Sequence, residues 1–191
     1  MNIAQNIENI KNIIMQPTGA WENLDADKLN IKSFFLIHVL GVLSLVFLGR
    51  FVGKSLEILS ISSIYYIASY AFFSLICEFL SFYLSVLVIN KLLPSYNVPE
   101  NFRKICLLLY YSLIPYYFIA FVINLFPSMY FLGIICLYGP VLFWFGTKSL
   151  FNFKKEDHLI FYIISIIIIA GIHLTLRFIV ILPFFNNIIK L

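Results

Sequence analysis

Charged side chains are scarce in this sequence, and they are unevenly distributed. Asp, Glu, Lys and Arg make up 12% of the 191 residues, whereas a soluble domain carries about 25%. Four stretches contain none of them: 33–49, 58–77, 105–147 and 159–176. Because about 20 apolar helical residues cross a bilayer core, each stretch is long enough to span a membrane. The shortage of charge therefore excludes a soluble domain and predicts an integral membrane protein.

Catalytic motifs and paired cysteines are also lacking. The three cysteines, Cys77, Cys106 and Cys136, lie in apolar segments without pairing spacing or an adjacent His, which predicts buried thiols. There is no glycine-rich phosphate loop, no H-E-x-x-H, no G-x-S-x-G and no carboxylate pair within an apolar stretch. We therefore expect no catalytic residue, no metal, no cofactor and no enzyme activity. No basic run exceeds two residues, so nucleic-acid binding is not expected either.

The longest uncharged stretch, 105–147, must turn back on itself. As one helix it would extend about 65 Å, roughly twice the bilayer core. Pro127 lies within the only convincing break, N-L-F-P-S-M-Y. This predicts a hairpin of spans at 105–126 and 130–150, and the remaining spans fall at 33–51, 60–90 and 159–182. The predicted fold class is all-α: a polytopic membrane protein with five transmembrane helices, the second of which could be one helix or two.

The distribution of Lys and Arg predicts the orientation of these spans. With the N-terminus inside, nine basic residues face the cytoplasm, and four face outward: Arg50, Lys54, Arg177 and Lys190. We therefore expect a protein of the cell inner membrane with a cytoplasmic N-terminus and an extracytoplasmic C-terminus. Its parts would be a cytoplasmic amphipathic segment (1–31), a five-helix transmembrane domain (32–185) and a short outer tail (186–191). The polar start lacks a cleavage pattern, so the first span is expected to be an uncleaved signal-anchor.

The segment before the first span has helical periodicity. Its isoleucines recur at spacings of four, three and four and form one apolar stripe: Ile3, Ile7, Ile10 and Ile14. Such a helix either lies in the membrane interface with the stripe toward the acyl chains, or packs on the protein's own cytoplasmic face. Pro17 ends it. Trp21 is expected at the membrane boundary, with its ring buried and its N–H in water.

Polar side chains also form a stripe within the second span. At 100° per residue, one arc contains Ser63, Tyr70, Ser74, Glu78, Ser81 and Ser85. Glu78 is the one carboxylate well inside a span, and such residues are candidates for function. The stripe could line a hydrated path or polar groove, or it could form hydrogen bonds between helices. The candidate site comprises Glu78, Ser74, Tyr70, Ser81 and His38.

Depth estimates favour His38 as the partner of Glu78. It lies about 9 Å inside Lys32 on the first span. Arg177 is expected near the opposite face, where it would extend to the outer interface. His173 is expected to hydrogen-bond with the backbone or with a tyrosine.

Three motifs in order resemble those of a known family. They are P-T-G-A-W-E-N-L (17–24), Y-S-L-I-P (111–115) and L-Y-G-P-V-L-F-W-F-G-T-K (137–148). They are similar to signatures of the bacterial branch of the Yip-one family, the Ypt/Rab-interacting membrane proteins. The resemblance implies a cytoplasmic N-terminal segment followed by five membrane helices, and its motif residues are Pro17, Trp21, Tyr111, Pro115, Tyr138 and Gly146. The family's D-L-Y-G-P is matched only by C-L-Y-G-P in another place, so Rab binding is not implied.

Structural explanations exist for several of these motif residues. Pro115 is expected to bend the third span, and Gly133, Gly139 and Gly146 to allow close approach of helices.

Two hypotheses for function follow. In the first, a non-enzymatic membrane protein resembling the Yip family organises membrane or partner proteins through its N-terminal segment. In the alternative, a small transporter, channel or lipid-handling protein uses the polar stripe around Glu78. Membrane lipids are the expected partners in both, protein partners would contact the N-terminal segment, and the oligomeric state stays open. A cavity along the stripe would favour the alternative.

Overall fold

The computed structural model describes residues 3–24, 26, 29–57 and 64–188, with side chains as far as residue 180. Throughout this part of the chain the regular structure is helical. A short N-terminal part contains α1 (Ile3–Met15) and the 3-10 turn η1 (Ala20–Asn23). The long helices follow: α2, η2 and α3 (Ile31–Ser33, Phe34–Val39, Leu40–Glu57), α4 with η4 (Ile64–Leu92, Leu93–Tyr96), α5 (Phe102–Leu125), η5 with α6 (Pro127–Leu137, Tyr138–Leu150) and α7 (Lys155–Ile188).

Five of these helical segments are long and apolar enough to cross a membrane. They are Ile31–Glu57, Ile64–Tyr96, Phe102–Leu125, Pro127–Leu150 and Lys155–Val180. The predicted fold class, an all-α protein with five membrane-spanning helices, is confirmed. The second span is one helix over its described length, and the predicted start of that span at residue 60 lies outside the described residues. The first span continues to Glu57, beyond the predicted end at residue 51.

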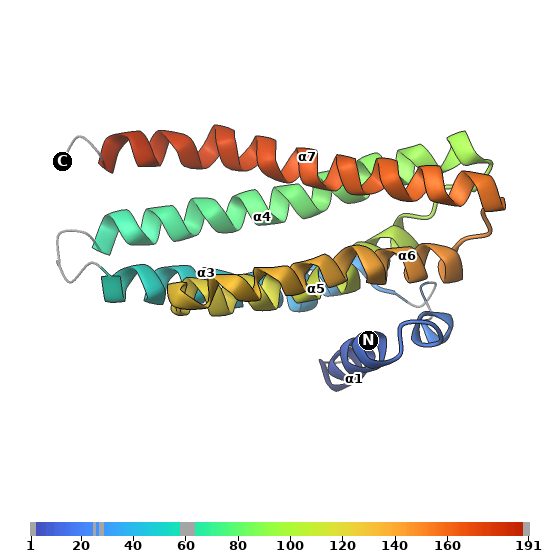
Figure 1. The fold of residues 1–191 in the computed structure, drawn as a ribbon, viewed down its shortest axis with the longest axis horizontal. Helices are drawn as coiled ribbons and strands as arrows, with labels where there is room; N and C mark the ends of the chain where they lie inside the picture. The colour runs from blue at the N-terminus through green and yellow to red at the C-terminus, as the bar shows by residue number, and fades with distance from the viewer. Residues whose placement is uncertain (1–2, 25, 27–28, 58–63, 189–191) are drawn as a thin grey trace.

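The long helices run side by side, and consecutive spans run in opposite directions (Figure 1). α7 lies along α4, while α5 packs against both α3 and α6. α5 is the central helix, and half of its residues are buried. We call the end formed by residues 90–104 and 147–158 the docked end, and the end formed by residues 50–57 and 121–130 the open end.

Side chains and proline determine where the central hairpin begins and turns. At the docked end, Asn101 caps α5 because its Oδ1 accepts a hydrogen bond from the backbone N–H of Lys104 at 3.0 Å. At the open end, α5 stops at Leu125 and Pro127 begins the 3-10 helix η5. Proline suits this position because the first turn of a helix has no use for its missing N–H. The hairpin predicted at Pro127 is therefore present.

Two glycines bring α3 and α5 into close contact near the open end. A Cβ on Gly49 would lie 2.9 Å from a ring carbon of Phe121, and one on Gly53 would collide with the carbonyl of Asn124. Small residues four positions apart form one smooth face and let membrane helices approach each other. The same explanation was predicted for three other glycines, and it holds for Gly139 and Gly146 but not for Gly133, which has only a distant neighbour at 4.0 Å.

The N-terminal segment is attached to the docked half of the bundle. Figure 1 shows α1 as a separate helix beneath the long helices, on the side of α5 and α6. Its inward face carries Asn6 and Ile13, which are buried. Ile3 and Ile7 keep 61% and 62% of their surface exposed. From the sequence alone, packing on the protein and an outward apolar stripe are alternatives. In the structure α1 has both, on two different faces.

Trp21 does not lie where the sequence predicts. The side chain is 0% exposed, and its Nε1 has no hydrogen-bond partner among the described residues, so the predicted wet N–H is wrong. The indole occupies the space left by the missing side chain of Gly146, whose Cβ would lie 3.0 Å from two of its ring carbons. Protein, rather than lipid headgroups, surrounds this tryptophan because the glycine provides a site for it.

Candidate functional site

A buried ion pair joins the first two spans. Arg50 of α3 donates a hydrogen bond from Nη2 to Oε1 of Glu78 on α4 at 2.7 Å, and both residues are 2% exposed. Two charges withdrawn from water are stable only with good geometry and additional hydrogen bonds. Arg50 can reach Glu78 because it lies seven residues before the end of α3, whereas the charge distribution had counted it among the basic residues that face outward.

Tyr116 and His173 complete this cluster. The Tyr116 hydroxyl donates to Oε1 of Glu78 at 3.1 Å and lies 3.2 Å from Nε2 of His173. Nδ1 of His173 lies 3.5 Å from the other carboxylate oxygen, Oε2. Four spans share the cluster because Arg50, Glu78, Tyr116 and His173 come from α3, α4, α5 and α7. The tyrosine hydroxyl therefore lies between the carboxylate and the imidazole and contacts both.

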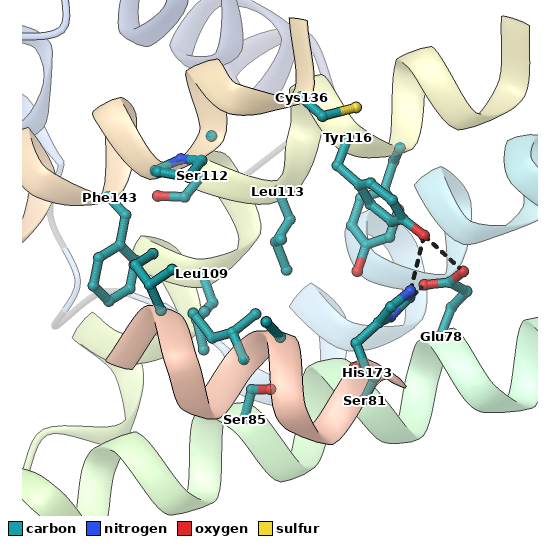
Figure 2. Close-up of a pocket in the computed structure, with 16 residues that line it drawn as sticks. Glu78, Ser81, Ser85, Leu109, Ser112, Leu113, Tyr116, Cys136, Phe143 and His173 are labelled. Carbon is teal, nitrogen blue, oxygen red and sulfur yellow. Dashed lines mark hydrogen bonds and ion pairs between the residues drawn. The ribbon is translucent and has the colours of Figure 1, made fainter. Parts of the chain in front are cut away.

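A cavity of about 220 Å³ begins at this cluster and extends toward the docked end. Figure 2 shows Glu78, Tyr116 and His173 at one side and Phe143, Leu109 and Ser85 at the other. α4, α5, α7 and the η5–α6 segment all contribute to the wall, whose members are Glu78, Ser81, Ser85, Leu109, Ser112, Leu113, Tyr116, Tyr117, Cys136, Gly139, Pro140, Phe143, Ile166, Ile169, Ala170 and His173. The cavity is therefore polar at one side and largely aliphatic along its length.

Two serine hydroxyls on the cavity wall have no hydrogen-bond partner among the described residues. Oγ of Ser85 and Oγ of Ser112 are buried and accept or donate no hydrogen bond within the described part of the chain. The hydroxyls of Ser74, Ser149 and Ser165 are also buried without a partner among the described residues, but these serines do not line the cavity. Elsewhere on the spans, Ser44, Ser55 and Ser69 donate to the backbone carbonyl four residues earlier, at 2.7–2.8 Å. Ser85 and Ser112 lack this bond although they are more buried, which makes them available to a molecule in the cavity.

The polar stripe predicted on the second span faces the protein interior, and only part of it lines the cavity. Glu78 and Ser81 are on the cavity wall. Ser74 is fully buried outside that wall, and Tyr70 is half-buried. Ser63 lies outside the described residues. The assignment of Glu78, Ser74, Tyr70, Ser81 and His38 as a functional site stays a prediction.

The structure does not bring His38 to Glu78. His38 precedes Arg50 by twelve positions on the same run of helix, a distance of about 18 Å, whereas Arg50 is in direct contact with Glu78. Instead, His38 is buried in the π-helical segment η2 and packs on Phe34, with ring centroids 5.6 Å apart. The depth estimate failed because α4 begins at Ile64, so Glu78 lies closer to the open end than assumed.

Sequence reasoning missed Arg50 and Tyr116 as partners of Glu78. A signal was present in G-R-F-V-G (49–53), where Arg50 lies between two glycines at the spacing of a close helix contact. An arginine next to such a contact faces the bundle rather than an outer loop. The prediction that His173 bonds to a tyrosine is confirmed by its contact with Tyr116. Of the three predicted buried thiols, Cys77 and Cys106 are buried, while Cys136 is partly exposed on the cavity wall.

The motif residues converge on the attachment of the N-terminal segment. Asn6 of α1 donates to the hydroxyl of Tyr110 at 2.8 Å and accepts from the hydroxyl of Tyr111 at 3.0 Å. Tyr138 donates to the carbonyl of Ile14 near the end of α1, at 2.9 Å. Trp21 meets Tyr111 edge-on, with ring centroids 6.1 Å apart. Four of the six motif residues, Trp21, Tyr111, Tyr138 and Gly146, thus hold one contact between the N-terminal segment and α5–α6.

No metal centre is present in the described part of the chain: no three side chains of His, Cys, Asp or Glu come together in a group that could hold an ion. Five apolar spans, an attached amphipathic helix and a buried polar cluster define a multi-pass membrane protein.

Within that class the chain belongs to the Yip family, because the family model described as the Yip1 domain matches residues 11–177. This is a family of non-enzymatic membrane proteins. Comparison with curated proteins and with solved structures gives no match. The resemblance inferred from the three motifs is therefore confirmed at the level of the family.

Proposed function

We propose that this Yip-family protein organises the membrane around it, and proteins within that membrane, through its attached N-terminal helix. The observation that carries the proposal is the two-faced character of α1. One face is bonded to the bundle through Asn6, and the other presents Ile3, Ile7 and Met15 outward.

This arrangement suits insertion into one leaflet. An amphipathic helix lies in the interface with its apolar face buried about 5–10 Å into the boundary between headgroups and chains. Because the bonds from Tyr110, Tyr111 and Tyr138 fix α1 to the spans, the inserted helix adds volume at a constant place beside the bundle. Such a fixed wedge expands one leaflet relative to the other and favours curvature.

The proposed location is the inner membrane, with the N-terminus in the cytoplasm. Basic residues gathered at the docked end support this orientation: Lys91, Arg103, Lys104, Lys148, Lys154 and Lys155. An impermeant protease added to sealed inverted vesicles should then remove a tag placed before Met1. Protection of the tag would reverse the orientation.

The decisive experiment reconstitutes the full chain in vesicles and measures vesicle diameter by electron microscopy. Deletion of residues 1–24 would also remove the buried Trp21, so the apolar face is changed instead with Ile3→Ser and Ile7→Ser together. A matched variant, Glu8→Ser with Asn12→Ser, changes two exposed polar positions of the same helix. We expect wild type and the matched variant to narrow the vesicles and the isoleucine variant to leave them unchanged. Equal narrowing by all three would refute the proposal.

The cavity beside Glu78 favours a second role, the handling of a membrane lipid. It lies along the predicted polar stripe, between spans whose outer faces expose large apolar side chains. Ala170→Phe on the cavity wall should slow the exchange of a fluorescent lipid between the leaflets of reconstituted vesicles. An exchange rate equal to that of protein-free vesicles for the wild type would exclude this role.

A further inference from the structure

We propose that the cavity binds a neutral, single-chain amphiphile with hydroxyl groups, of the monoacylglycerol class, which enters sideways from the bilayer. The proposal rests on the second role given above, lipid handling, and names the chemical class of the molecule held.

The walls call for a hydrocarbon chain. Beyond the cluster the cavity is lined by aliphatic and aromatic side chains, including Leu109, Leu113, Phe143, Ile166 and Ile169. An apolar cavity of about 150 Å³ accepts benzene. By that scale, the 220 Å³ present here holds about nine carbon atoms. A chain of medium length, or part of a longer one, fills it.

The two serines without hydrogen-bond partners favour a ligand whose chain carries hydroxyl groups. A buried hydroxyl without a partner costs free energy, yet Ser85 and Ser112 line the same cavity from α4 and α5. Each can donate one hydrogen bond and accept others. A glycerol hydroxyl offers both a donor and an acceptor, so it satisfies either serine whichever way its proton points.

The ionisable side chains on the cavity wall favour a ligand with a neutral headgroup. On the wall itself, the ionisable side chains are Glu78, His173, two tyrosines and Cys136, and none is Lys or Arg. Glu78 is already neutralised by Arg50. Arg177, one turn beyond His173, acts electrostatically on Tyr116 and His173 but is not part of the wall. A phosphate in the cavity would therefore have no cation on the wall to pair with it, which is costly.

A sideways entrance lies between α6 and α7. These helices touch near the docked end, where Trp144 meets Tyr162 with ring centroids 5.1 Å apart. Toward the open end, the cavity lies between α6 and α7 in place of such contacts. There the side chain of His173 is 20% exposed, whereas that of Glu78 behind it is 3% exposed. His173 and the exposed Ala170 therefore mark the mouth.

The test uses the full chain in nanodiscs and a 1-decanoylglycerol probe with a diazirine in its chain. After illumination, labelled peptides are identified by mass spectrometry. We expect labelling of the cavity-lining parts of α5 and α7, competed by unlabelled 1-decanoylglycerol but not by decylphosphocholine or decanoate. Removing the hydroxyls with Ser85→Ala and Ser112→Ala should reduce labelling about fivefold for each hydroxyl lost.

Two pairs of variants separate the cavity from the surrounding lipid surface. Ala170→Phe should block the mouth and abolish labelling, while Gly171→Phe, whose side chain points into open space, should preserve it. Ser44→Ala, which removes a hydroxyl already bonded to Leu40, serves as the control for the serines. Equal labelling in Ala170→Phe and wild type, or equal competition by all three amphiphiles, would overturn the proposal. Labelling as expected without lipid exchange would support the binding site and refute the lipid-handling role alone.

Discussion

The two ends of the bundle are held together in different ways. At the docked end, hydrogen bonds join many elements: Lys104 to the carbonyl of Leu150 at 3.0 Å, Thr147 with His158 at 2.8 Å, and Lys91 with Glu100 at 2.9 Å. The N-terminal segment adds further bonds in the adjoining half of the bundle, to Tyr110, Tyr111 and Tyr138. Toward the open end, the described residues rely on the close approach of α3 and α5 and on the cluster around Glu78. The docked end should therefore keep its structure when one of its hydrogen bonds is lost. The open end should not, because it depends on a single cluster.

The largest effect is therefore expected from Arg50→Met. This change leaves Glu78 buried without its cation, and breaking a buried pair in this way costs about 3–5 kcal/mol. Unfolding by SDS in mixed micelles measures the loss, and hydrogen exchange should locate it in α3 and α4. The double variant Arg50→Met with Glu78→Met should recover most of the stability, because two apolar side chains can replace an ion pair. A double variant as unstable as the single one would show that the pair is not the cause.

A loss of about 3–4 kcal/mol is expected from Trp21→Ala, since the indole fills a closed space beside Gly146 and truncation leaves a cavity. The same unfolding measurement applies, with Glu22→Ala as the exposed neighbour that should change little. Trp21 is the exception to redundancy at the docked end. A cost below about 1 kcal/mol would mean that the ring lies in lipid after all.

A smaller loss, about 1 kcal/mol, is expected from Tyr111→Phe. The hydroxyl exchanges bonds with Asn6 and Asn9, and a typical hydrogen bond contributes about 0.5–1.5 kcal/mol. Tyr65→Phe, at an exposed position near the open end, is the control for removal of a tyrosine hydroxyl. Complete release of α1, seen as rapid proteolysis within residues 3–15, would contradict the redundancy of the docked end.

The smallest effect is expected from Tyr130→Ala at the open end. This side chain is 76% exposed, and exposed substitutions usually change stability by less than about 0.5 kcal/mol. Thermal unfolding in micelles provides the measurement. A loss above about 1 kcal/mol would instead reveal that another protein surface covers this end.

The features that follow from local periodicity were predictable. Charge-free stretches gave the five spans, isoleucine spacing gave α1, and Pro127 gave the turn of the central hairpin. Contacts between distant segments were not. The local sequence around Trp21 is the same whether the indole lies at a membrane boundary or in a glycine-lined space within the protein. The difference is made by Gly146, more than a hundred residues away.

Only part of the candidate site could be predicted, because its remaining contacts also join distant segments of the chain. Helical spacing placed Glu78, Ser81 and Ser85 on one face, and that face lines the cavity. Choosing a partner for Glu78 required the length of each helix. With the first span predicted to end at residue 51, Arg50 was counted among the residues that face outward, whereas α3 continues to Glu57.

The 3-10 helix η5 makes the fourth span longer than an α-helix with the same number of residues would be. A 3-10 helix rises about 2.0 Å per residue and an α-helix about 1.5 Å. The segment is kinked at Met129, and the eight residues after the kink, 130–137, would thus shorten by about 4 Å on conversion to α-helix. That distance is about three quarters of one α-helical turn. The chain therefore contains, next to Cys136 and Gly139 of the cavity wall, a segment whose length differs by most of one helical turn between its 3-10 and α-helical forms.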